Sequence, residues 1–277
     1  MAGKMIVLSG VVSGAAAGGP AIKMSAADQI AASAPSLAYA ITPSTLKMGA
    51  DGLLTGRDRA SGKLLTAAGV GASNLKVSTM GGKPAINTGD VMVASSLNLP
   101  LGAASSSYTV VQAVYLSDTA INTATSLFNP VVVMGPTIYI AAPARYYGKS
   151  STLGDVSYRG QFVSGGSTAT DPWARITAPT VKGWVILISA YDDVTKQSTL
   201  GLNGIDTSSI NTVYKTVGLV VDETSYWSIG YSLSKNSLLD CGVGDTYIFN
   251  DSLLSTDSGK KRLAALVASM KTAYGVV

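Results

Sequence analysis

The chain of 277 residues contains no histidine, one cysteine and one glutamate. The absence of histidine excludes Ser-His-Asp triads, histidine-ligated zinc or iron sites, and the usual general base near neutral pH. Cys241 has no second thiol for an internal disulfide and no histidine to activate it, so we expect a small buried side chain. The sequence therefore predicts no catalytic residues and a protein that is not an enzyme.

Charge is also scarce, at 13% of residues, against about 25% in ordinary soluble domains. The net charge is +4, and the longest basic run, Lys260–Arg262, is too short to indicate nucleic-acid binding. No run approaches the ~20 apolar residues that a membrane helix needs. A surface of short neutral polar groups favours an assembly, with a secreted or heat-tolerant monomer as the alternative.

Residues 1–45 differ from the rest because they are rich in Ala, Gly and Ser. Their first residues resemble a signal peptide, but Gly10 interrupts the apolar stretch, so we expect an ordered N-terminal arm. A helix is predicted from Ser25, a suitable N-cap, to just before Pro35. The segment has too little bulk for its own core, and it is interpreted as an arm that docks on the main domain or on another chain.

Residues 46–277 show an all-β pattern and are predicted to form one domain. Short runs of β-branched and aromatic residues alternate with clusters of Gly, Asn, Asp and Pro, as in a sandwich or barrel. The expected strands include Tyr108–Leu116, Val131–Met134, Ile138–Ile140, Trp184–Tyr191, Ser198–Leu202, Trp227–Tyr231 and Asp245–Phe249.

The C-terminal segment predicts one amphipathic helix. It follows N-cap candidates at Ser255–Asp257 and ends near Gly275. Its apolar stripe, at positions i, i+3, i+4 and i+7, consists of Leu263, Leu266, Val267 and Met270. The helix is expected to lie against the sandwich.

Three stretches in order resemble the concanavalin A-like lectin/glucanase superfamily, in particular its LamG-like jelly rolls. They are residues 61–69 with 81–86, residues 183–192 followed by 198–204, and residues 242–255 followed by the helix and Ala273–Val276. Asn203-Gly204 suits the positive φ values of a tight hairpin. The resemblance covers about residues 50–277 and implies an antiparallel jelly-roll β-sandwich. Residues 141–179 are longer and richer in Gly and Ser than in simple members, so this region is elaborated.

The superfamily includes glycoside hydrolases, which use two carboxylates across the sugar, but Glu223 is the single glutamate here. A divergent hydrolase is therefore the least favoured function. Lectin relatives often bind calcium through Asp and backbone oxygens, which makes Asp240, Asp245, Asp192 and Asp193 conceivable ligands. Ordinary turn and capping roles are the favoured interpretation, with no cofactor and no metal site.

Carbohydrate binding would need exposed aromatic rings beside polar groups. The first candidate is Trp173, with Asp171 and Arg175 on either side, and the second is the pair Tyr146 and Tyr147. The alternative is that Trp173 anchors its loop in the core or in a neighbouring subunit. The other two tryptophans open strands and are expected in the core: Trp184 and Trp227.

The favoured function is a non-enzymatic structural protein of a bacteriophage virion, as a capsid decoration or a tail, fibre or baseplate component. It would act through contacts with itself, as a homo-oligomer such as a trimer, and with other virion proteins. The alternative is a lectin-like, receptor-binding module that recognises a host surface glycan. Neither nucleic acid nor a membrane is an expected partner.

Overall fold

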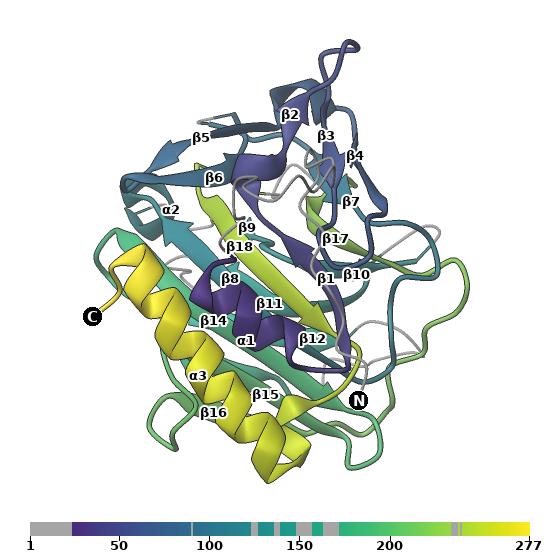
Figure 1. Ribbon diagram of the computed structural model, residues 1–277, viewed down its shortest axis with the longest axis vertical. Helices are drawn as coiled ribbons and strands as arrows, with labels where there is room; N and C mark the ends of the chain where they lie inside the picture. Colours follow the sequence, from purple (N-terminus) through teal and green to yellow (C-terminus); the bar gives the residue numbers. More distant parts are fainter. Residues whose placement is uncertain are drawn as a thin grey trace, which may run out of the picture.

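The computed structural model describes residues 24–89, 91–122, 127–135, 139–147, 157–162, 172–233, 238 and 240–277. Within these ranges the chain forms two packed sheets, with helices across the outer face of one of them (Figure 1). Every printed strand pairing is antiparallel, so the predicted all-β sandwich is confirmed. The first 23 residues of the predicted arm lie outside the described residues.

Sheet A has eight strands among the described residues. In spatial order these are β16 (Ile210–Tyr214), β15 (Gln197–Leu202), β14 (Gly183–Asp192), β8 (Tyr108–Leu116), β18 (Gly242–Phe249), β6 (Lys83–Asn87) and β5 (Lys76–Met80). The eighth strand, β1 (Leu37–Ile41), pairs with residues 246–249 of β18, whereas β6 pairs with β18 at Val243.

Sheet B has ten strands among the described residues. In spatial order these are β13 (Ala174–Thr177), β12 (Ser157–Phe162), β11 (Tyr139–Tyr147), β10 (Val132–Met134), β17 (Tyr226–Tyr231), β7 (Ser95–Asn98), β4 (Leu64–Ala68), β3 (Leu54–Arg57) and β2 (Lys47–Met48). The short β9 (Leu127–Phe128) pairs with the end of β11. Short helical turns connect strands at η1 (Pro43–Thr45), η2 (Ala72–Asn74) and α2 (Asp118–Asn122), and η3 (Leu253–Ser255) connects β18 to α3.

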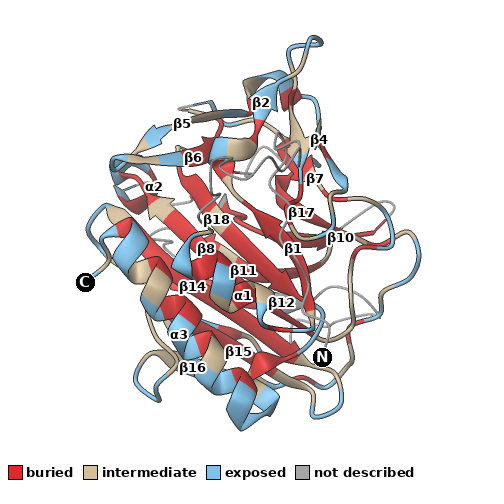
Figure 2. Cartoon of the chain, in the orientation of Figure 1, coloured by how far each residue is buried: buried red, intermediate tan, exposed pale blue. Residues whose placement is uncertain are grey.

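The central strands β8 and β14 are apolar on both faces. In β8, Val110 and Val114 point into the core between the sheets, whereas Val111 packs on the outer side under the helices. In β14, Leu187 faces inward and Ile188 outward. Continuous apolar runs of this kind are what a strand needs when both faces are covered, and Figure 2 shows these strands as buried.

Helix α3 (Asp257–Tyr274) lies across the outer face of sheet A and confirms the predicted C-terminal helix. Its N-cap, Thr256, accepts a hydrogen bond from the Gly259 N–H at 3.1 Å. Gly275 ends the helix with φ of 67°, the left-handed conformation that glycine adopts without strain. All four residues of the predicted apolar stripe are buried.

Helix α1 (Ala26–Ala32) lies beside α3 on the same face of sheet A (Figure 1). Ser25 caps it, as predicted, by accepting a hydrogen bond from the Asp28 N–H at 3.0 Å. The following strand β1 is buried along its whole length. The described part of the predicted docking segment therefore packs on the sandwich of its own chain and extends sheet A.

A buried ion pair attaches α1 to the sandwich. Both terminal nitrogens of Arg59 donate to the Asp28 carboxylate, at 2.7 and 2.6 Å, and the Tyr247 hydroxyl donates to it at 2.8 Å. Burial alone would raise the pKa of Asp28, but the hydrogen bonds and charge of Arg59 outweigh it and lower that pKa. The carboxylate is therefore stabilised in its charged form by partners from two distant parts of the chain, Arg59 and Tyr247.

Two buried side chains also connect the sheets through the core. Gln112 of β8 donates to the Pro130 carbonyl at 3.2 Å, and Ser189 of β14 donates to the Pro143 carbonyl at 2.8 Å. Such bonds fix the register of one sheet over the other, which apolar contacts alone do only loosely. Among the described helices, none is both long enough and apolar enough to span a bilayer.

Removing one partner of the buried pair should be costly. We expect Arg59→Met to lower the free energy of unfolding by about 3–5 kcal/mol, because it leaves the Asp28 carboxylate buried without its cation. The double variant Asp28→Leu/Arg59→Met should recover much of this loss. Urea unfolding at pH 7 measures both, with Arg57→Gln as a matched exposed control expected within about 0.5 kcal/mol of the wild type. An Arg59→Met cost no greater than that of the control would contradict the role of the pair.

Candidate functional site

The register of sheet B places three arginines in a row. Arg145 on β11 is directly opposite Arg159 on β12, and Arg159 is directly opposite Arg175 on β13. The neighbouring residues Tyr146 and Tyr158 point into the core and their rings are in edge contact, with centroids 5.4 Å apart. Because successive side chains alternate between faces, the arginines lie on the outer face of sheet B. We call Arg145, Arg159 and Arg175 the arginine row.

An indole ring lies beside the centre of this row. The guanidinium carbon of Arg159 is 5.8 Å from the centroid of the Trp173 ring, within the range of a cation–π contact. The Arg159 Nε also donates to the Ser157 hydroxyl at 3.0 Å. Trp173 is half-buried, Arg159 is buried and Arg175 is exposed. The face therefore presents a half-buried indole and the exposed side chain of Arg175, whereas Arg159 is buried.

A buried lysine forms hydrogen bonds that fix the segment carrying the indole. Lys215 is 4% exposed, and its Nζ donates to the carbonyls of Gly160, on β12, and of Pro172. The Arg175 N–H donates to the Asn211 side-chain oxygen at 2.9 Å, which connects β13 to β16 of the other sheet. These bonds fix the start of β13, and with it the position of the adjacent indole.

Two of the five predicted carbohydrate-binding residues, Trp173 and Arg175, are brought together on this face. Asp171 lies outside the described residues, and for Tyr147 only the backbone, paired with Ser157, is described. The expectation of an exposed ring at Tyr146 is wrong. Its ring is fully buried between the sheets and its hydroxyl donates to the Ala120 carbonyl at 3.3 Å.

Sequence reasoning missed Arg145 and Arg159, which lie 14 residues apart in the chain and meet only through strand pairing. The signal that would have found them is the alternation of β11 and β12, but an irregularity between Ala142 and Arg145 shifts the register by one residue. Trp184 and Trp227, predicted to be core residues, are both buried.

The conceivable calcium ligands occupy separate environments. Asp192 and Asp193 form the predicted turn after β14: Asp192 accepts from the Val194 N–H at 2.9 Å, and Asp193 pairs with Lys196. The described residues contain no group of three or more His, Cys, Asp or Glu side chains suited to hold a metal. The single glutamate, Glu223, is exposed in a turn before β17.

The thiol of Cys241 is fully buried, as predicted. Burial raises its pKa to about 12. A thiol with such a pKa carries almost no thiolate at neutral pH, and the thiolate is the reactive form. Cys241 is therefore a core side chain.

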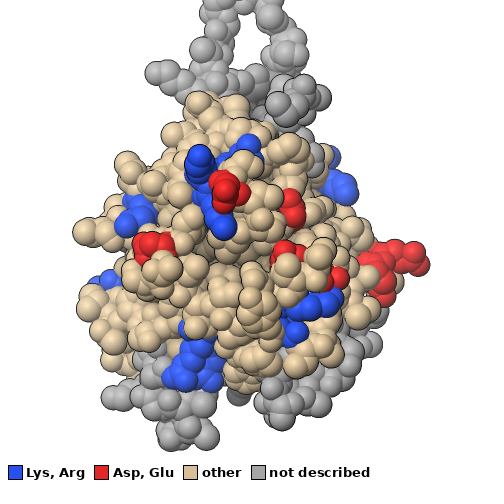
Figure 3. All heavy atoms as spheres, turned by 90° about the horizontal axis from the view of Figure 1, so that it is seen from below, with Lys and Arg blue, Asp and Glu red and all other residues tan. Residues whose placement is uncertain are grey.

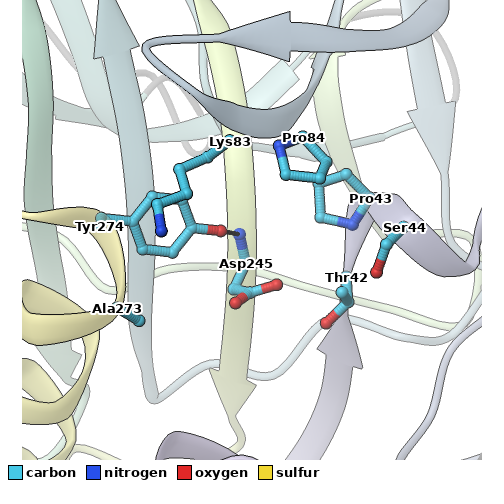
Figure 4. Close-up of a pocket in the computed structure, with 8 residues that line it drawn as sticks. All are labelled: Thr42, Pro43, Ser44, Lys83, Pro84, Asp245, Ala273 and Tyr274. Carbon is cyan, nitrogen blue, oxygen red and sulfur yellow. Dashed lines mark hydrogen bonds between the residues drawn. The ribbon is translucent and has the colours of Figure 1, made fainter.

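A small cavity of about 160 Å³ lies where the end of α3 meets β18 and η1 (Figure 4). The Asp245 carboxyl points into it between Tyr274 and Thr42, and the Tyr274 hydroxyl accepts a hydrogen bond from the Asp245 N–H at 2.7 Å. Ligand pockets usually measure about 300–1,000 Å³, so this cavity is too small for a sugar.

Two larger grooves fall within that size range. One, of about 500 Å³, lies between α1 and α3 and is lined mainly by Ala, Ser and Thr. The other, of about 380 Å³, lies at the ends of β8 and β14 and is lined in part by Tyr115, Asp118, Lys182 and Asp240. The Tyr115 ring packs edge-on against Trp184, and Lys182 pairs with Asp118 at 2.7 Å. This second groove is the competing location for a ligand.

The Asp245 carboxyl should make the fold less stable as pH rises. Burial raises its pKa in the folded chain, so the folded state binds the proton more tightly than the unfolded state. Stability is then lost as pH rises from the unfolded pKa, about 3.9, through the folded pKa. We expect Asp245→Asn, which stays neutral, to unfold at a higher temperature than the wild type at pH 7, with the difference shrinking toward pH 4.

Thermal unfolding across this pH range measures the effect. The matched control is Asp206→Asn, because hydrogen bonds from Ser208 and Ser209 lower the pKa of exposed Asp206. That variant should change stability in the opposite direction at pH 7. A decrease in stability for Asp245→Asn at pH 7 would show that the carboxylate is favourable where it lies.

No family model matches this sequence, and no curated protein matches it. Solved structures match in fold. One is a sialidase from Trypanosoma rangeli in complex with sialic acid, with a TM-score of 0.55, 12% identity, and coverage of 86% of this chain and 34% of that chain. Another is domain 4 of a GH43 extracellular arabinanase from Geobacillus stearothermophilus in complex with arabinotriose. Its TM-score is 0.52 at 13% identity, and the match covers 82% of this chain and 98% of that domain.

At these identities the likeness shows the fold. The chain has an antiparallel β-sandwich, as the sequence predicts, and it shares this fold with both structures. It spans about a third of the sialidase but nearly all of the arabinanase domain.

Proposed function

We propose that the chain is a non-catalytic carbohydrate-binding module whose binding face is the outer surface of β11, β12 and β13. The observation that carries the proposal is the half-exposed ring of Trp173 beside the arginine row. An indole offers a large apolar surface to the C–H face of a sugar ring, and guanidinium groups donate hydrogen bonds to sugar oxygens. Lys215 holds the segment that presents the ring, which reduces the entropy lost on binding.

The structural comparisons agree with a sugar-binding role. The arabinanase domain has the same fold over nearly its whole length and was solved with a bound oligosaccharide, arabinotriose. That match concerns a single domain, comparable to this chain in extent. We take from it the kind of ligand, an oligosaccharide, and take the position of the binding face from the arrangement of Trp173 and the arginine row.

Removing the indole should abolish binding. We expect Trp173→Ala to lower the affinity for a glycan identified on an array by at least tenfold, because the stacking surface is lost. The matched control is Tyr214→Ala, which removes a 63% exposed ring on the edge of sheet A and should bind like the wild type. Isothermal titration calorimetry measures both affinities, and circular dichroism confirms that both variants are folded.

Two outcomes would count against this face. Binding that survives in Trp173→Ala but is lost in Tyr115→Ala would move the site to the groove at the ends of β8 and β14. Release of reducing sugar from the bound glycan by the wild type would contradict the non-catalytic role.

A second proposal, a structural role in a bacteriophage virion, is favoured by the surface. In Figure 3 the charged side chains form small groups separated by neutral residues. Several apolar side chains are also exposed, among them Val70 at 96%, Val194 at 90% and Val181 at 74%. Such a surface suits contacts with further copies of this chain and with other virion proteins, and a virion protein could present the sugar-binding face to a host glycan.

Oligomeric state tests this second role. Light scattering on the full chain, separated by size exclusion at micromolar concentrations, should give the mass of a homo-oligomer such as a trimer. A mass of 28.2 kDa, that of one chain, at every concentration would contradict self-assembly while leaving sugar binding unaffected.

A further inference from the structure

We propose that the groove at the ends of β8 and β14 is a second carbohydrate site, which takes a neutral sugar unit and lets one chain contact a polysaccharide at two places. The groove stands on its own geometry, whereas the pairing of two contacts rests on the proposed binding face at Trp173. The inference is carried by a juxtaposition of groups in one hollow of about 380 Å³: an aromatic ring, and an ammonium group paired with a carboxylate.

Segments that are distant in sequence form this groove. The turn between β5 and β6, around Gly81, lines it together with the end of β8 and the start of α2. Lys182, just before β14, and Asp240, just before β18, complete the lining. Figure 1 shows α2 near the β5–β6 turn at one end of the sandwich. The volume of the groove falls within the range of about 300–1,000 Å³ that is typical of ligand pockets.

The aromatic ring in the groove is fixed by its neighbours. Half-buried Tyr115 is in edge contact with Trp184, with ring centroids 5.4 Å apart, and the Trp184 Nε1 donates to the Met80 carbonyl at 3.0 Å. Gly81 lies so close to both rings that a Cβ built there would be 2.8 Å from each of them. Trp184 does not itself line the groove. The exposed part of the Tyr115 ring is therefore a preorganised apolar surface for the C–H face of a sugar.

A paired cation and anion supply hydrogen bonds beside this ring. The Lys182 Nζ lies 2.7 Å from an oxygen of the Asp118 carboxylate, and the two side chains are 56% and 62% exposed. Each sugar hydroxyl both donates and accepts, so two adjacent hydroxyls match an ammonium donor next to a carboxylate acceptor. Hydrogen bonds to charged groups are also stronger than those between neutral groups.

The charge of the groove favours a neutral ligand. Its lining contains two carboxylates, Asp118 and Asp240, and one ammonium group, Lys182. This leaves an excess of one negative charge, which repels a sugar that carries a carboxylate or sulfate. The same carboxylates accept hydrogen bonds from the hydroxyls of a neutral sugar.

The two proposed sites are close enough for one polysaccharide to reach both. Trp173 and Lys182 are nine residues apart in the chain. At about 3.3–3.6 Å per extended residue, their Cα atoms are separated by at most about 32 Å. Once a polysaccharide occupies one site, its contact with the other is intramolecular, which raises the overall affinity without new contacts.

Affinity electrophoresis of the full chain tests the proposal in gels that contain one polysaccharide each. The probes are arabinan, dextran and mannan as neutral polymers and polygalacturonate as an acidic one. We expect at least one neutral polymer to bind at least tenfold more tightly than polygalacturonate. Lys182→Met and Trp173→Ala should each weaken binding of that polymer at least tenfold, because each leaves a single site.

A trisaccharide of the same polymer locates the two sites in a ¹H–¹⁵N spectrum of the labelled full chain. We expect saturable shifts both of the Trp173 indole signal and of the backbone amide signals of Gly81 and Ser117. Lys182→Met and Asp118→Asn should remove the shifts of Gly81 and Ser117 and leave that of Trp173. Lys260→Met is the matched control, because Lys260 is a 52% exposed lysine whose nearest acidic partner, Asp257, is also exposed; it should behave like the wild type.

The outcomes separate the groove from the face at Trp173. Shifts confined to Trp173 and unchanged in Lys182→Met would overturn the groove and leave the proposed function intact. Shifts confined to Gly81 and Ser117 and lost in Lys182→Met would support the groove and overturn the β11–β13 face.

Three further results would overturn the groove proposal. Tighter binding of polygalacturonate that depends on Lys182 would contradict a neutral ligand. An equal loss of binding in Lys260→Met and Lys182→Met would show that net charge alone explains the effect. Absence of binding to all four polymers and to a glycan array would overturn the groove and the carbohydrate-binding function together.

Discussion

The burial of sheet A on both of its faces is the constraint from which the rest of the structure follows. Its inner face forms the core with sheet B, and its outer face is covered by α1 and α3. The ion pair between Asp28 and Arg59, joined by Tyr247, holds α1 in this position. With the centre of sheet A covered in this way, an extended ligand has to bind at a sheet edge, at an end of the sandwich, or on the outer face of sheet B.

The outer face of sheet B offers a surface for an extended ligand next to the edge strand β13. The side chains that face inward there, Tyr146 and Tyr158 among them, complete the core. The adjacent positions on these strands point away from the core and carry arginine, of which Arg159 is buried and Arg175 exposed. Lys215, although cationic and buried, supports this arrangement by donating to the main-chain carbonyls of Gly160, on β12, and of Pro172, just before β13. The alternation of side chains along β11 and β12 thus places tyrosines in the core and arginines on the opposite face of the sheet.

Local signals in the sequence predicted the helices and strands, but not the contacts between elements that are distant in sequence. The caps at Ser25 and Gly275 and the apolar stripe of α3 are short-range features, and the structure confirms them. The Asp28–Arg59 pair and the pairing of β1 with β18 depend on contacts distant in sequence, which no local pattern encodes. Tyr146 was misplaced because alternation allows one of two adjacent tyrosines to face inward, and the register shift in β11 decides which. The arginine row was missed for the same reason.

The three tryptophans provide a direct test of the binding face. Trp227 is buried between the sheets and Trp184 under α3 on the outer face of sheet A, whereas Trp173 is half-buried beside Arg159. In a ¹H–¹⁵N spectrum each indole N–H gives one signal, and an oligosaccharide identified on a glycan array can be titrated into the labelled full chain. We expect a saturable shift of the Trp173 signal, with the signals of Trp184 and Trp227 nearly unchanged. Saturable binding that leaves the Trp173 signal in place would contradict it.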